Sequence, residues 1–172
     1  NSIVAKRIKR SEGPFFRFLY IIHKLITLVF TGKKINFGNY SCLIKKDVQM
    51  ISDKASLWSS YSGTVKKFLE HLGEIDSIRG ERYFGPSKMS LYKLVLHSFA
   101  IIAVFKYRAL TTSILVVLAL SYFNSYLGFI SLFFQAGTVL FIVLIFLVSL
   151  REKKQDLLNC QENLKNIEEI SH

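Results

Sequence analysis

Two short stretches of the sequence combine cationic side chains with glycine. The first is 6-KRIKRSEG-13 and the second is 79-RGERYFGPSK-88. Arginine presents a planar fork of donors that fits phosphate oxygens, lysine supplies a point charge, and glycine lets the backbone approach an anion closely. Both stretches therefore predict anion binding. The anion is either a substrate phosphate or an anionic lipid headgroup, which attracts each nearby cation by about 1 kcal/mol.

Patterns typical of soluble enzymes are missing from the sequence. It has no phosphate-binding loop of the Walker type, no His/Cys cluster at metal-binding spacing and no nucleophile elbow. Glu74 and Asp76 have the spacing of a metal-binding acidic pair, but their neighbours do not resemble such a motif, so the pair is given no role. Cys42 and Cys160 lie far apart and predict neither a disulfide nor a metal site.

The longest uncharged stretch predicts a helical hairpin. Residues 111–150 contain no Asp, Glu, Lys, Arg or His in 40 positions, and one crossing of a bilayer takes about 20 apolar residues. The segment 124-NSYLG-128 interrupts the apolar pattern with residues that favour a turn. We therefore expect a transmembrane hairpin over 107–150. The alternative is a buried helical pair in a soluble protein, but such helices usually carry a polar stripe.

Basic residues flank this hairpin on both sides. Lys106 and Arg108 precede it, and Arg151, Lys153 and Lys154 follow it. Cytoplasmic loops of membrane proteins are enriched in Lys and Arg. The pattern predicts a multi-pass protein of the inner (cytoplasmic) membrane with both termini in the cytoplasm. The composition agrees, with 51% hydrophobic residues, a mean hydropathy of +0.31 and a net charge of +11 in 172 residues.

Two further apolar segments carry cations and are expected to lie along the membrane surface. Residues 15–31 have apolar side chains at helical spacing, with Arg17 and Lys24 off that face. Residues 91–105 form a second such segment, which leads into the hairpin. Helices of this kind lie in the headgroup plane. For residues 15–31, an ordinary core helix of an α/β domain is the alternative.

The remaining segments suggest the end of an α/β domain. We expect extended segments over 35–44 and 73–83, and one or two helices over 45–72 that join near 59–63. These elements are too few for a complete α/β domain. The tail, 151–172, is expected to form a solvated helix. Apolar residues at a/d spacing would allow helix pairing as the alternative, but two heptads are too short to establish it.

Three ordered blocks of the sequence resemble a known family. They are 7-RIKRSEG-13, 35-INFGNYSCLIKKDV-48 and 79-RGERYFGPSKMSLYKLVLHSFAIIAVF-105. In the last block, the pattern R-x-x-G-x-S-K of that family is matched by Arg82, Gly85, Ser87 and Lys88. On these residues the chain resembles the bacterial family 2 glycosyltransferases that act on polyprenyl phosphate. These are relatives of dolichol-phosphate mannose synthase with a C-terminal transmembrane hairpin.

The resemblance implies a domain organisation and an activity. It implies the C-terminal part of a cytoplasmic α/β domain of GT-A type over 1–90, an interfacial helix over 91–106, the hairpin over 107–150 and a cytoplasmic tail over 151–172. The family transfers a sugar from a nucleotide-sugar to a polyprenyl phosphate, of the undecaprenyl or dolichyl type, at the cytoplasmic face of the membrane.

The resemblance also implies roles for single residues and for a metal. Arg7 and Arg10 would contact phosphates of the donor or acceptor, while Arg82, Ser87 and Lys88 would hold the pyrophosphate or the lipid phosphate. The family uses a divalent cation, Mg²⁺ or Mn²⁺, whose ligands lie upstream of the three blocks. Because those upstream strands are missing and Asn1 is not a methionine, we expect a C-terminal portion of the enzyme that is inactive alone.

Asn39 stands where many members of the family have an aspartate in a Gly-Asp-Phe motif. An amide does not take up a proton at neutral pH, so Asn39 is no general base. A phosphate monoester has a second pKa of about 6, so the acceptor oxygen is already largely ionised and needs no base. We expect Asn39 to be a hydrogen-bonding group near the acceptor, and we assign no catalytic residue.

An alternative function belongs to a different class. The chain would then be a small non-enzymatic membrane protein whose basic cytoplasmic face binds anionic lipid or a partner protein. Membrane lipid is an expected partner under both interpretations, and nucleic acid is not. A two-helix hairpin buries little protein surface by itself, so the sequence also allows a homo-oligomer that associates through the hairpin or the tail.

Overall fold

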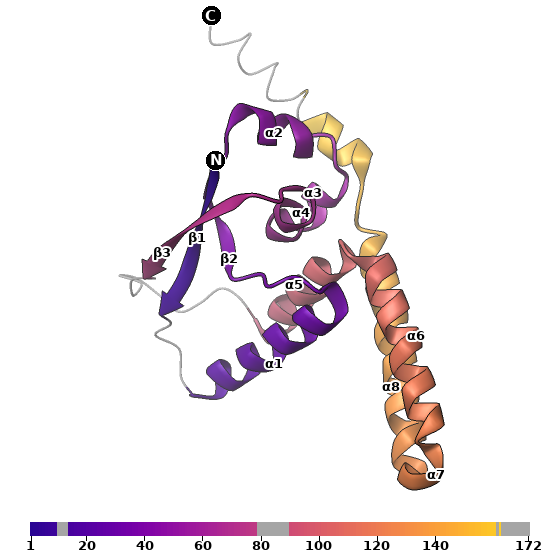
Figure 1. Cartoon of the computed structure of the whole chain (residues 1–172). Coiled ribbons are helices and arrows are strands. Elements are labelled where there is room, and N and C mark those ends of the chain that lie inside the picture. Colours follow the sequence, from indigo (N-terminus) through magenta and orange to yellow (C-terminus); the bar gives the residue numbers. More distant parts are fainter. Residues whose placement is uncertain (10–13, 79–89, 161, 163–172) are drawn as a thin grey trace, which may run out of the picture.

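The structure of this chain is a computed structural model that describes residues 1–9, 14–78, 90–160 and 162. It is mostly helical, with one small sheet (Figure 1). The elements in chain order are β1 (Ser2–Lys9), α1 (Pro14–Thr31), β2 (Phe37–Cys42), α2 (Lys45–Ile51), α3 (Ser56–Ser59), α4 (Tyr61–Phe68), β3 (Leu72–Ile78), α5 (Leu91–Ala103), α6 (Lys106–Tyr122), α7 (Asn124–Leu127) and α8 (Phe129–Ser149). Residues 154–160 are also helical.

The sheet has the strand order β2-β1-β3, with β1 in the middle (Figure 1). β2 is antiparallel to β1, and β3 is parallel to it. The pairing of β1 with β2 is irregular, because one residue separates Val4 from Lys6 whereas three separate their partners Ser41 and Phe37. Such bulges bend a strand and are common beside functional sites.

Helices cover one face of the sheet and form a core with it. The buried cluster consists of Val4, Phe37, Ile51, Val65 and Leu69. Burying each such side chain contributes about 1.5–3 kcal/mol. Alternate residues of a strand point to opposite faces, so Val4 faces α2 and α4. Lys6, two residues further along β1, lies on the same face.

Most of the predicted elements are present. The helix α1 covers the predicted segment 15–31, α5 covers all but the last two residues of the predicted segment 91–105, and β2 lies within the predicted extended segment 35–44. β3 begins at Leu72, one residue before the predicted extended segment 73–83 and at the last residue of the predicted helical segment 45–72. The predicted break at 124–128 is also confirmed: it consists of α7 and Gly128, whose φ is +53°. Three helices stand where one or two were predicted. Ser60 caps a separate α4, because its side chain accepts a hydrogen bond from the Gly63 amide at 3.3 Å.

The helix α1 exposes apolar side chains and buries hydroxyl groups. Phe18, Leu25 and Val29 are exposed, whereas Thr27 and Thr31 are buried. The Thr31 hydroxyl donates to the Thr27 carbonyl at 2.6 Å, which satisfies it inside the protein. A surface helix of a water-soluble domain turns its apolar stripe toward the core. The polarity of α1 is therefore reversed.

The helices α6 and α8 pack side by side with the same reversed polarity (Figure 1). Ser113 and Ser131 are buried, and the Ser131 hydroxyl donates to the Leu120 carbonyl across the pair at 2.7 Å. The outward-facing side chains are large and apolar: Ile114, Leu115, Leu118, Ile130, Leu132, Phe133, Phe134, Val139, Leu140, Val143 and Leu147. Helix pairs in membranes pack through small and hydroxyl-bearing residues in this way.

The number of membrane-spanning helices depends on how α5 and α6 are counted. Within the described residues, one helix is long and apolar enough to cross a membrane, the one that begins at Phe129. A second exists if α5 and α6, which meet at 94°, count as one bent span. α6 alone has 17 residues, which rise about 26 Å, slightly less than the bilayer core of about 30 Å.

Gly32 ends α1 in a conformation that only glycine adopts without strain. Its φ is +64°, and a Cβ added there would overlap the Arg108 guanidinium. The Gly32→Ala substitution should therefore lower the free energy of unfolding by about 1–3 kcal/mol. Denaturant titration in detergent measures this loss. Gly137→Ala is the matched control, because a Cβ at Gly137 meets no atom within 4 Å. Equal stability of the two variants would contradict the prediction.

Candidate functional site

The candidate site lies at the carboxyl ends of two parallel strands. β1 and β3 end side by side, where Lys9 pairs with Ile78 (Figure 1). Lys9 lies within the first basic segment, 6–13, which begins inside β1, and Ile78 directly precedes the second, 79–88. Ligands of open α/β sheets bind beyond the carboxyl ends of the strands. The topology therefore joins both segments to the edge of the sheet at which a ligand would be expected.

Most of the predicted site residues fall outside the part of the chain that the structure describes. Arg10, Arg82, Ser87 and Lys88 belong to residues 10–13 and 79–89, which are not described. The backbone of Arg7 pairs with Ser77 in the sheet, but its side chain is not described. The phosphate-binding roles of these five residues therefore stay predictions.

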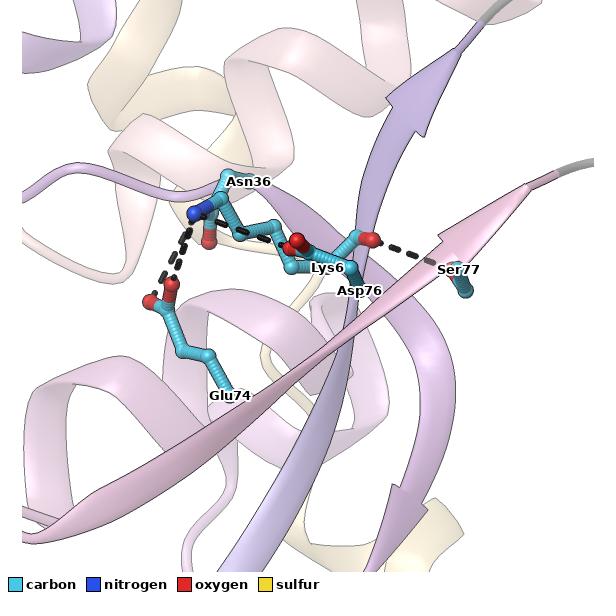
Figure 2. Close-up of polar contacts among 5 residues, drawn as sticks. All are labelled: Lys6, Asn36, Glu74, Asp76 and Ser77. Atoms are coloured by element: carbon cyan, nitrogen blue, oxygen red, sulfur yellow. Dashed lines mark hydrogen bonds and ion pairs between the residues drawn. The ribbon is translucent and has the colours of Figure 1, made fainter.

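A polar cluster lies just before these strand ends, on the face that carries the core. Figure 2 shows Lys6, Asn36, Glu74 and Asp76 converging from β1, the segment after α1, and β3. The Lys6 ammonium is 3.5 Å from Glu74 Oε2 and 3.8 Å from Asp76 Oδ1. On this face of the sheet, the apolar side chain of Val4 is thus followed two residues later by the charged side chain of Lys6.

Asn36 is the buried member of this cluster. It is 5% exposed, and its Nδ2 donates to Glu74 Oε2 at 3.3 Å. Its Oδ1 is buried without a hydrogen-bond partner. Asn36 was not among the residues predicted to form a site. The available signal was its place between Ile35 and Phe37, which are both buried, because a polar residue between two core residues usually has a partner.

The charges of the cluster decide which ligands suit it. Two carboxylates and one ammonium leave a net charge of −1, which repels phosphate. The cluster itself is therefore not a phosphate site, and phosphates would have to be bound by cations elsewhere. The carbonyl of Lys6 also accepts a hydrogen bond from the Ser77 hydroxyl at 3.1 Å, which ties the ends of β1 and β3 together (Figure 2).

The described residues do not fit a divalent metal ion. No three His, Cys, Asp or Glu side chains come together among residues 1–9, 14–78, 90–160 and 162 in a way that would hold one. Between Glu74 and Asp76, the place of a cation is taken by the Lys6 ammonium. The acidic pair that the sequence analysis left without a role therefore serves an ion-pair network, and ion pairs of this exposure stabilise a fold only modestly.

Asn39 lies apart from this cluster. It is exposed and lies in the irregular part of β2. β1 separates β2 from β3 in the sheet. Its side chain forms no hydrogen bond with another described residue. The structure thus brings together Lys6, Asn36, Glu74 and Asp76. Asn39 lies on the edge strand β2, and its contact with the acceptor stays a prediction.

Comparisons of this chain with protein-family models, with curated proteins and with solved structures find no match. The fold described above and the motifs of the sequence therefore carry the functional argument by themselves.

Proposed function

We propose that this chain forms the membrane-side part of a glycosyltransferase that moves a sugar from a nucleotide-sugar to a polyprenyl phosphate. The observation that carries the proposal is the pairing of Lys9 with Ile78 at the carboxyl ends of β1 and β3. Lys9 lies within one, and Ile78 directly precedes the other, of the two segments that resemble the phosphate-holding segments of the family. The R-x-x-G-x-S-K pattern at Arg82–Lys88 suggests the kind of reaction.

The proposed reaction needs phosphate binding more than it needs a base. A phosphate oxygen of the acceptor attacks the anomeric carbon of the sugar, and the bond from that carbon to the nucleotide diphosphate breaks. The acceptor is already largely ionised, since its second pKa is about 6. Arg10, Arg82 and Lys88 would hold the acceptor phosphate and the donor diphosphate, and they would stabilise the charge that develops on the departing diphosphate. Asn39 would donate a hydrogen bond near the acceptor.

The metal of the resembled family has no place in the described part of this chain. We therefore assign no step to a metal ion held by these residues, and we propose that such an ion would be bound by an upstream part of the enzyme. The negative charge of Glu74 and Asp76 agrees with a metal site elsewhere in the enzyme. It repels phosphate groups from the polar cluster, so these groups would lie beyond the strand ends, beside the basic segments.

A bilayer explains the reversed polarity of α1 and of the α6–α8 hairpin. We propose that the hairpin crosses the cytoplasmic membrane with both chain ends in the cytoplasm, and that α1 and α5 lie in the headgroup plane. The angle of 94° between α5 and α6 supports this arrangement, since a helix perpendicular to a spanning helix runs along the membrane surface. The strand ends would then face a phosphate at the lipid headgroups.

The proposal is tested by transfer of labelled sugar in vesicles. The complete natural protein that contains these residues is incubated with a panel of radiolabelled nucleotide-sugars and vesicles that contain polyprenyl phosphate. We expect label from one donor to enter the organic-solvent extract. If no donor gives label, and the protein instead binds anionic vesicles with an affinity that falls as salt rises, the non-enzymatic lipid-binding function is correct.

A further inference from the structure

The junction between α5 and α6 is a sharp elbow held by buried residues. The helices meet at 94°, and Ile101, Val104 and Phe105 at the bend pack with Ile35 in one buried cluster. Ile35 is the residue before Asn36, the buried member of the polar cluster at the sheet. One short segment of backbone thus contacts the elbow with one side chain and the candidate site with the next.

A lysine of α4 binds the elbow directly. The Lys67 ammonium donates to the Val104 carbonyl at 2.6 Å, and Val104 is the C-cap of α5. The last carbonyls of a helix lack partners within the helix and attract cations. Partial desolvation of the ammonium is the main cause that lowers the pKa of Lys67, although the residue as a whole is exposed, and the Glu152 carboxylate opposes that shift. α4 approaches closely here, since a Cβ at Gly63 would lie 3.3 Å from the Ile101 carbonyl oxygen.

A second contact joins the start of α6 to the residues that follow α8. The Lys106 ammonium is 3.3 Å from Glu152 Oε2, and the two side chains are only 25% and 15% exposed. The other carboxylate oxygen of Glu152 is buried without a hydrogen-bond partner. Partly buried charge pairs of this kind are costly to break, because the remaining charge is left unpaired.

We propose that Lys67, Lys106 and Glu152 form a clamp that holds α5 perpendicular to the hairpin. Lys67 joins the elbow to α4, which packs on the sheet. The Lys106–Glu152 pair joins the elbow to the residues that follow α8. Through Ile35, the same clamp sets the position of Asn36 relative to the hairpin. The inference concerns the conformation of the chain and does not depend on the proposed transfer reaction.

The clamp is tested by the distance between two spin labels. Tyr92 near the start of α5 and Tyr122 at the end of α6 are both exposed, and each is replaced by a labelled cysteine. Cys42 and Cys160, which are exposed and free, are replaced by serine. α5 has 13 residues and is about 20 Å long, so a change of 20° at the elbow moves its far end by about 7 Å.

The decisive variant combines Lys67→Met with Glu152→Gln. In nanodiscs, we expect its distance distribution, measured by pulsed electron paramagnetic resonance, to broaden and to shift by several ångströms from that of the parent. The matched control combines Lys66→Met with Glu70→Gln, residues that form no hydrogen bond or ion pair with another described residue, and it should keep the parent distribution.

Two single variants distinguish loss of the clamp from loss of folding. Lys67→Arg still donates to a carbonyl, so it should keep the parent distance, while Glu152→Gln alone should broaden it. Helix content by circular dichroism identifies any variant that has unfolded. If Glu152→Gln and the decisive variant fold and both give the parent distribution, the clamp does not exist. The same holds if the control pair changes the distance as much as the decisive pair does.

Discussion

Replacing Leu140 by arginine is expected to lower the apparent equilibrium constant for membrane insertion by about 100-fold. Leu140 is 60% exposed and lies near the middle of α8. An arginine at the centre of a spanning helix costs about 2.5–3.5 kcal/mol on insertion scales. The measurement is the fraction of chain that resists alkaline extraction from membranes.

The same substitution distinguishes a membrane hairpin from a helical pair in water. In a soluble protein, replacing an exposed leucine changes stability by no more than about 0.5 kcal/mol. Leu158→Arg is the matched control, because Leu158 is also exposed but follows α8 in the helical segment 154–160. If the Leu140 and Leu158 variants are extracted equally, the hairpin does not cross the bilayer.

Replacing Arg82 by alanine is expected to reduce the rate of sugar transfer by about 100-fold or more. Arg82 begins the R-x-x-G-x-S-K pattern, and we propose that it holds a phosphate whose charge changes during the reaction. Removing one donor to such a charge costs about 10²–10³ in rate. Initial rates with the complete protein in vesicles, at saturating acceptor, measure the effect.

Membrane binding is the necessary companion measurement for the Arg82 variant. The proposed anchor, the α6–α8 hairpin, is apolar, so the variant should stay in the membrane fraction. Lys93→Ala is the matched control, since it removes an exposed cation of α5 outside the pattern, and it should leave the rate within about twofold. Loss of transfer together with loss of membrane binding would favour a purely electrostatic anchor. Full retention of transfer would remove Arg82 from the site.

Local patterns in the sequence were enough to locate most helices. The apolar periodicity of residues 15–31 and 91–105 corresponds to α1 and α5, and the polar interruption at 124–128 corresponds to α7 and Gly128. These features depend on residues close in sequence. What covers the apolar stripe of each helix did not follow from the pattern, because periodicity defines such a stripe without stating whether protein or lipid covers it.

Features that depend on distant residues escaped the sequence analysis. No strand was predicted over 2–9, because the charges of Lys6, Arg7 and Lys9 mask the short apolar pattern around Val4. The segment is a strand because it pairs with residues 37–42 and 72–78. The cluster around Asn36 and the Lys106–Glu152 pair join residues 38 and 46 positions apart. Neither set is recognisable from spacing along the chain.

The central claim is that a lipid phosphate accepts the sugar. The most direct measurement compares two acceptors in the same vesicles with the complete protein: polyprenyl phosphate and the polyprenol that lacks the phosphate. Our account predicts that labelled sugar enters the lipid extract with polyprenyl phosphate and stays at background with polyprenol. Equal labelling of both lipids, or no labelling with any nucleotide-sugar, would contradict it.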